Sequence, residues 1–217
     1  MIPIVVTGAG DPVGNGLIAS LAQPGGNLTG LSLGGNELYG KRLELLKEAV
    51  PKTSRVVFFW YRSSEAVPSL LNDIQTPAKA LGLQLQSIEV LNRNDFDDPF
   101  HTAVKWGAHG LMVSIHPVFI GNRKQFLDFA AKNRLAAIYY ATEFVEDGGL
   151  MSYAPQVADL WRRAATYVDK ILKGRAPSDL PVEQPLKFEF IINLKAAKPI
   201  GLTIPPNVLV RADKVIK

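Results

Sequence analysis

Short apolar runs and amphipathic stretches alternate along almost the whole of the 217-residue chain. The apolar runs are rich in β-branched and aromatic residues, which favours strands. The predicted strands are Ile2–Val6, Leu28–Leu33, Arg55–Trp60, Leu83–Val90, Gly110–Ile115, Ala136–Tyr140, Leu150–Tyr153 and Phe188–Asn193. Between them, apolar residues recur at three- and four-residue spacing, which predicts helices. The predicted helices are 12–21, 37–50, 66–81, 95–106, 120–134, 155–172 and 194–199.

This alternation predicts an α/β fold with mainly parallel sheets flanked by helices. The four strands between Arg55 and Tyr140 form a set that can build a sheet of its own. The first two strands and the helix between them cannot cover a sheet on both faces. The helix that begins at Pro155 is expected to cover them, which would still leave a thin lobe.

Composition and charge argue against several classes of function. The formal charge is +4, and the Lys and Arg residues are scattered in runs no longer than two, which does not favour nucleic-acid binding. The chain has no cysteine, which excludes a thiol nucleophile, a disulfide and a thiolate metal site. No apolar run approaches the ~20 residues of a membrane span. The sequence as given also opens without the pattern of an export signal.

A glycine-rich turn follows the first strand and precedes the first predicted helix, where a dinucleotide site would lie. The spacing does not fit, because Gly8 and Gly10 would require a third glycine where Val13 stands, and Pro12 stiffens the loop. A nucleotide-dependent enzyme is therefore disfavoured. The turn suits an anionic group such as a carboxylate. The alternative is that Asp11 only caps the helix.

The three histidines do not form a metal site, since none is spaced four residues from another. His109 lies at the end of a helix, where a cation is ordinarily favoured. His116 differs because it follows the strand Gly110–Ile115, at the carboxyl end where open α/β sheets bind ligands. We expect His116 to face a ligand.

The hydroxyls and acids do not assemble a catalytic group. No serine lies in a Gly-x-Ser-x-Gly turn, and the paired acids Asp97-Asp98 and Glu146-Asp147 lie in solvated contexts. Aromatic residues gather instead where strands end, at Trp60-Tyr61, Tyr139-Tyr140 and Tyr153. Such aromatic walls suit a small organic ligand, although ordinary core packing is the alternative. The sequence predicts no enzyme, no cofactor and no metal.

Four ordered blocks resemble a single family over the whole chain. They are Asp11-Pro12-Val13-Gly14 through Thr29-Gly30-Leu31-Ser32, Lys41-Arg42-Leu43-Glu44-Leu45-Leu46-Lys47, Glu143-Phe144-Val145 through Ser152-Tyr153, and Lys170-Ile171-Leu172-Lys173-Gly174 through Gln184-Pro185. Together they resemble the ABC transporter substrate-binding proteins of the tryptophan/tyrosine-type periplasmic component family.

The resemblance implies a type I periplasmic-binding-protein fold, whose two lobes close on a small solute in an interlobe cleft. Residues 1–34 plus about 150–180 would form an incomplete first lobe, and about 52–145 plus 186–200 the second. Some relatives bind aromatic amino acids. The implied location is the periplasm, and the implied partner is an ABC permease of the inner membrane.

Two departures from the family pattern bear on function. The loop after Trp60 usually carries an Asn-Pro pair, but here it is Tyr61-Arg62-Ser63-Ser64. Family members also begin with an export signal and the first half of lobe one, so the chain resembles an N-terminally truncated member. A truncated lobe would leave a sheet edge and an apolar face uncovered, which favours pairing into a homodimer.

The leading hypothesis is a receptor for an amino acid or related small carboxylate. The expected ligand-binding residues are Thr7, Asp11, Ser63, His116, Tyr139 and Tyr153. The alternative hypothesis is a ligand-free, dimeric structural or interaction protein.

Overall fold

The computed structural model describes residues 1–61, 67–92 and 95–217, the side chains of 67–69 excepted, and they form two compact units. Unit 1 contains Met1–Asn36 and Pro155–Phe188. Unit 2 contains residues 37–61, Ser69–Ala154 and Glu189–Lys217. The helix that begins at Glu37, which the lobe prediction left unassigned, lies in unit 2.

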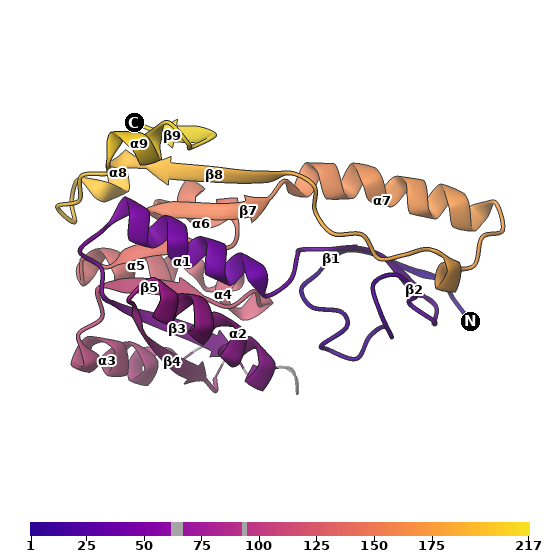
Figure 1. The fold of residues 1–217 in the computed structure, drawn as a ribbon, viewed down its shortest axis with the longest axis horizontal. Coiled ribbons are helices and arrows are strands. Elements are labelled where there is room, and N and C mark those ends of the chain that lie inside the picture. Colours follow the sequence, from indigo (N-terminus) through magenta and orange to yellow (C-terminus); the bar gives the residue numbers. More distant parts are fainter. Residues whose placement is uncertain (62–66, 93–94) are drawn as a thin grey trace. The chain divides into compact units, whose positions relative to one another are not determined.

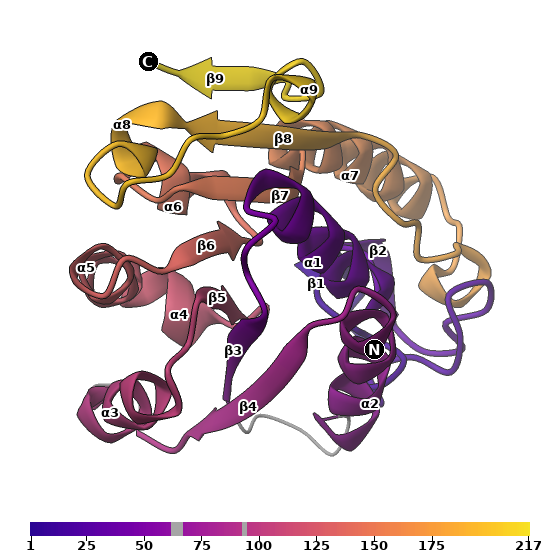
Figure 2. The same ribbon diagram turned by 60° about the vertical axis from the view of Figure 1, so that its left-hand side comes forward.

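Unit 2 is built on a sheet of seven described strands in the order β4-β3-β5-β6-β7-β8-β9 (Figure 2). Their bounds are β3 Arg55–Tyr61, β4 Gln84–Val90, β5 Gly110–Val113, β6 Ala136–Tyr139, β7 Met151–Pro155, β8 Phe188–Asn193 and β9 Lys214–Ile216. From β4 to β7 the neighbouring strands are parallel. β8 runs antiparallel to β7, because Asn193 N bonds to Leu150 O while Gln156 N bonds to Lys187 O.

Alternate residues of each strand enter different cores, one on each face of this sheet. In β3, Val56 and Phe58 join the core that α1 covers, whereas Val57 and Phe59 join the opposite core. The second core is aromatic: the Phe59 and Phe126 rings pack edge to face with centroids 5.5 Å apart. Burial on both faces explains why β3 reads as a continuous apolar run.

The helices of unit 2 flank the sheet, with α1 and α2 on one face and α3 and α5 on the other (Figure 2). Their bounds are α1 Glu37–Ala49, α2 Val67–Ala80, α3 Asp97–Trp106, α4 Pro117–Gly121, α5 Arg123–Lys132, α6 Thr142–Glu146, α8 Leu194–Ala197 and α9 Pro206–Leu209. α3 ends at Gly107, whose φ of 73° is the left-handed conformation that terminates helices.

Three parts of unit 2 differ from the prediction. The single helix expected over Ile120–Arg134 is divided into α4 and α5, because Asn122 leaves the helical conformation. The short helix α6 was not predicted. The tail after Pro205-Pro206, for which no element was predicted, forms α9 and then β9, which pairs in parallel with β8.

Unit 1 contains two parallel strands, β1 Ile4–Ala9 and β2 Leu28–Ser32, with the helix α7 Val157–Leu172 packed against them (Figure 1). Its small core consists of Leu31, Leu160, Ala164, Tyr167 and Leu180. The 3₁₀ helix η1, Pro177–Asp179, precedes a segment that pairs with β2 on its other side, where Ser32 N bonds to Glu183 O. Arg163 of α7 donates a hydrogen bond to the Glu183 carboxylate, which lowers the pKa of Glu183.

The helix predicted over residues 12–21 is wrong. One turn forms after Asp11 and ends at once, because Gly16 takes a φ of 67°. Leu17 N bonds to Pro12 O and Gly16 N to Val13 O, which is the pattern of a helix terminus closed by glycine. Val13 and Leu17 have the spacing of one helix face, but they do not lie on a helix, and both side chains are exposed.

The apolar face of α7 is wider than the part of it that packs against the core of unit 1. At about 100° per residue, Leu160, Ala164 and Tyr167 occupy one stripe of the helix and are buried. The adjacent stripe is Val157, Trp161, Val168 and Leu172, and all four are exposed, Trp161 by 62%. We call these four residues the α7 stripe.

A substitution at Gly30 tests the close pairing of β1 with β2. Its φ is 128°, and a Cβ there would lie 2.7 Å from Val6 N, so Gly30→Ala is expected to destabilise the chain by about 3 kcal/mol. The control is Gly26→Ala, since Gly26 has open space around its α-carbon. Thermal unfolding of both variants measures the difference. Equal stability of the two would contradict this account of unit 1.

Candidate functional site

The carboxyl ends of the parallel strands in unit 2 bring together residues that the sequence placed at separate strand ends. Tyr61 ends β3, and His116 follows β5. Their rings stack, with centroids 4.7 Å apart and planes inclined by 27°. Neighbouring parallel strands end at one edge of a sheet, so this contact is a direct consequence of the β3–β5 register.

His116 is held in one orientation by its own local structure. It is the N-cap of α4, and its Nδ1 accepts a hydrogen bond of 3.2 Å from Val118 N. An Nδ1 that accepts leaves the ring proton on Nε2. Pro117 follows at the first helical position, where its fixed φ suits a helix start.

Two tyrosines fix the backbone on either side of this imidazole. The Tyr39 hydroxyl of α1 accepts from Ile115 N at 2.8 Å, and the Tyr140 hydroxyl donates to His116 O at 2.9 Å. Burial raises the pKa of both phenols, so both stay neutral at physiological pH. Ile115 N and His116 O, at the strand end that carries His116, are therefore both held by hydrogen bonds to tyrosine hydroxyls.

Arg42 lies beside these tyrosines, although it sits on the apolar face of α1. Its side chain is buried, 1% exposed, and its guanidinium lies over the Tyr39 ring at 5.4 Å from the centroid. Nε donates to Tyr153 O at 3.0 Å. Burial lowers the pKa of Arg42 to about 10, which still leaves it charged at neutral pH.

Sequence reasoning missed Arg42, yet a signal was available. Leu38, Leu45, Leu46 and Ala49 define the buried face of α1, and residue 42 follows Leu38 by one turn. A charged residue on an apolar face is rarely buried without a reason.

The other expected ligand residues fall in different places. Tyr153 lies on β7, half-buried, with its carbonyl bonded to Arg42. Tyr139 is 1% exposed, stacks on Phe144 at 4.4 Å, and belongs to the core rather than to the group around His116. Its hydroxyl has no partner in the structure, and burial raises its pKa. Ser63 lies outside the described residues.

Thr7 and Asp11 belong to unit 1. Thr7 is half-buried in β1, and Asp11 follows that strand. Asp11 Oδ1 accepts from Gly14 N at 2.9 Å, so this carboxylate caps the single turn that follows it. The capping alternative is therefore observed for Asp11, while the ligand roles of Thr7 and Asp11 remain predictions.

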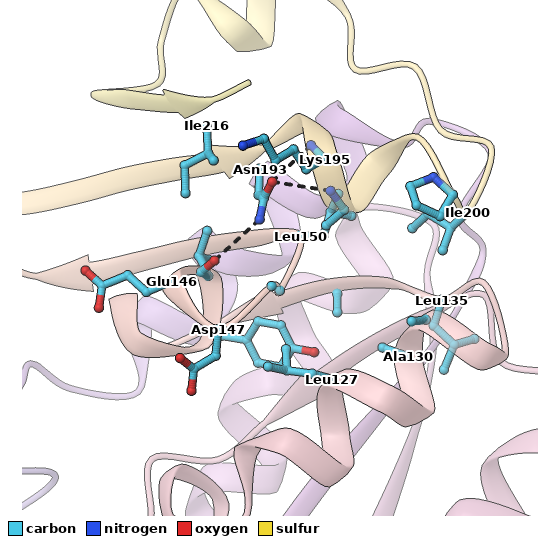
Figure 3. Close-up of a pocket in the computed structure, with 18 residues that line it drawn as sticks. Leu127, Ala130, Leu135, Glu146, Asp147, Leu150, Asn193, Lys195, Ile200 and Ile216 are labelled. Carbon is cyan, nitrogen blue, oxygen red and sulfur yellow. Dashed lines mark hydrogen bonds between the residues drawn. The ribbon is translucent and has the colours of Figure 1, made fainter.

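A cavity of about 590 Å³ lies elsewhere in unit 2, among α5, the start of β7 and the end of β8 (Figure 3). Leu127, Leu135, Leu150 and Ile200 give it largely apolar walls. Asn193 is committed to structure, since its Oδ1 accepts from Lys195 N and Ala196 N. Because strands β6 and β7 begin here, this cavity is distinct from the edge that carries His116.

Other site types find no support in the described ranges. Within 1–61, 67–92 and 95–217, no three His, Cys, Asp or Glu side chains gather in a way that could hold a metal ion. In the same ranges, no helix is long and apolar enough to cross a membrane.

The fold and this edge define an α/β protein of the periplasmic-binding-protein kind, which confirms the predicted class. The family model for ABC transporter substrate binding proteins matches residues 1–216. The chain therefore belongs to the ABC transporter substrate-binding protein family, as its sequence blocks predicted.

Three relatives illustrate the similarity. An ABC domain from Streptococcus pneumonia, solved in complex with L-Trp, is 26% identical with a TM-score of 0.89, over 99% of this chain and 72% of that one. A conserved domain protein from Vibrio cholerae is 28% identical with a TM-score of 0.90, over 98% of this chain and 71% of that one. A tyrosine-binding protein from Clostridioides difficile is 24% identical over 201 residues. That alignment covers 93% of this chain but 57% of the relative, so the chain spans little more than half its length.

Substitutions of the adjacent residues Tyr139 and Tyr140 test the hydrogen bonding at the strand end that carries His116. Tyr140→Phe removes the hydrogen bond to His116 O and is expected to cost about 1 kcal/mol of the free energy of unfolding. Tyr139→Phe removes a hydroxyl that has no partner, so it should leave stability unchanged or raise it. Urea denaturation of both variants compares them directly. A larger loss for Tyr139→Phe would show that the hydroxyls are placed wrongly.

Proposed function

We propose that this chain is the substrate-binding component of an ABC importer and captures an amino acid with an aromatic side chain, or a related small carboxylate. Capture is noncovalent and needs neither a cofactor nor a chemical step. The chain works outside the cytoplasmic membrane, in the periplasm, and delivers its solute to an ABC permease. Closure of two lobes around the solute remains a prediction from the family resemblance.

One observation carries the proposal: the stacked rings of Tyr61 and His116 at the carboxyl edge of a parallel sheet. A planar pair that includes a polar imidazole suits a solute that is partly aromatic and partly polar. The names of two similar proteins point the same way, since one is described as tyrosine-binding and the other was solved with L-Trp.

The roles within this site differ in their support. His116 and Tyr61 supply the stacked ring pair, and Tyr153 lies on strand β7, with β6 between it and β5. Thr7, Asp11, Ser63 and Tyr139 stay as predicted ligand residues whose contribution binding measurements have to establish. Asp11 has one carboxylate oxygen engaged in the turn, which weakens its claim to a solute ammonium.

The binding prediction is tested by calorimetry with L-tryptophan, L-tyrosine, L-phenylalanine, L-leucine and benzoate. We expect the aromatic amino acids to bind most tightly. His116→Ala should weaken them about tenfold, because it removes both a hydrogen bond and a ring contact. His101→Ala is the matched control, since His101 is exposed on α3. A folded wild-type chain that binds none of these solutes would contradict the proposal.

The alternative, a ligand-free dimer of this chain, is favoured by the α7 stripe. Four exposed apolar side chains on one face of a helix form a surface that a second copy would cover. Trp161 is the largest of them, and aromatic residues dominate association energies.

Light scattering during size-exclusion chromatography tests this alternative. If the chain dimerises through the α7 stripe, Trp161→Glu yields a monomer, because a charge would be buried in the contact. Arg162→Glu is the control, because Arg162 is exposed beside the stripe and its side chain already faces solvent. A wild-type monomer at high concentration would exclude this alternative.

A further inference from the structure

Arg42 carries a buried charge that forms no ion pair among the described residues. Nη1 and Nη2 are inaccessible to solvent and have no hydrogen-bond partner in the structure. Only Nε is engaged, with Tyr153 O. Buried charges in proteins are normally paired, because an isolated ion loses its hydration without compensation.

Within 1–61, 67–92 and 95–217, no carboxylate forms a hydrogen bond or an ion pair with the guanidinium. The described groups that interact electrostatically with it are the phenols of Tyr39, Tyr153 and Tyr140, and burial raises the pKa of Tyr39 and of Tyr140. On the same helix, Glu44 pairs with Lys41 at 2.7 Å. None of the salt bridges among the described residues includes Arg42.

The same tyrosines connect this cation to the candidate site. Tyr39, whose ring lies beneath the guanidinium, bonds to the peptide before His116, and Tyr140 bonds to the peptide of His116 itself. Tyr153 is the most exposed of the three, being half-buried on β7. The unpaired guanidinium therefore belongs to the same edge as the Tyr61–His116 stack.

We infer that Arg42 binds the carboxylate of the solute through Nη1 and Nη2. This inference rests on the proposed function and specifies which solute group is recognised. Guanidinium is planar and binds a carboxylate through two parallel N–H···O bonds, which would satisfy both unpartnered nitrogens. Because Nη1 and Nη2 are inaccessible to solvent, the half-buried Tyr153 side chain has to shift to admit the carboxylate, while the ring of the solute lies against Tyr61 and His116.

The inference has a consequence for the protein without its solute. An unpaired buried cation lowers stability, so replacing it with an apolar side chain of similar length should raise the melting temperature. Arg42→Met is therefore expected to raise Tm of the solute-free chain by a few degrees while it impairs binding. A residue that served only to hold the fold together would show the opposite change in Tm.

Calorimetry with L-tryptophan and tryptamine isolates the carboxylate, because tryptamine lacks only that group. Arg42→Met is expected to weaken L-tryptophan about 30-fold or more and to leave tryptamine unchanged. Arg42→Lys should be intermediate, because a lysine keeps the charge but not the paired donors. Lys41→Met, which removes the adjacent cation, is the control and should bind as the wild type does.

The outcomes separate the two proposals. If wild type binds L-tryptophan and Arg42→Met binds it equally well, the role of Arg42 is overturned and the proposed function stands. Equal weakening of L-tryptophan and tryptamine, with a lower Tm, also overturns it, since that result indicates a structural role. A wild-type chain that binds no aromatic amino acid and no aromatic carboxylate overturns both.

Discussion

The need to bury both faces of one mainly parallel sheet governs the structure of unit 2. Strand β3 has its alternate residues in two different cores, and each core needs its own helices. α1 covers one face, and its buried side must follow the sheet for its whole length. Arg42 lies on that buried side, so the same helix that closes a core also brings a guanidinium to the strand ends.

The sequence predicts this sheet well because burial on both faces leaves an unmistakable pattern. A continuous run of β-branched and aromatic residues such as Arg55–Tyr61 is compatible with few structures other than a strand that is buried on both faces. The prediction fails where local conformation decides. Apolar spacing predicts a helix over residues 12–21, but Gly16 in the left-handed region ends the turn. β9 was missed because its three residues gain their order from pairing with β8, which no local pattern encodes.

The candidate site is partly predictable for the same reason. His116 follows from the rule that ligands meet parallel sheets at their carboxyl ends, and its position after β5 is confirmed. Its stacking partner and its two backbone anchors come from other elements, so no single segment reveals them. Tyr139 and Tyr140 show the limit: both side chains belong to the same core and contact the Phe144 ring, and only the tertiary structure tells which hydroxyl reaches His116 O.

The two tyrosine anchors have a consequence for the thermodynamics of recognition. Because Ile115 N and His116 O are already engaged, the strand end has little conformational freedom left to lose when a solute arrives. Ordering a loop on binding normally reduces affinity, and a rigid recognition surface avoids that entropic penalty.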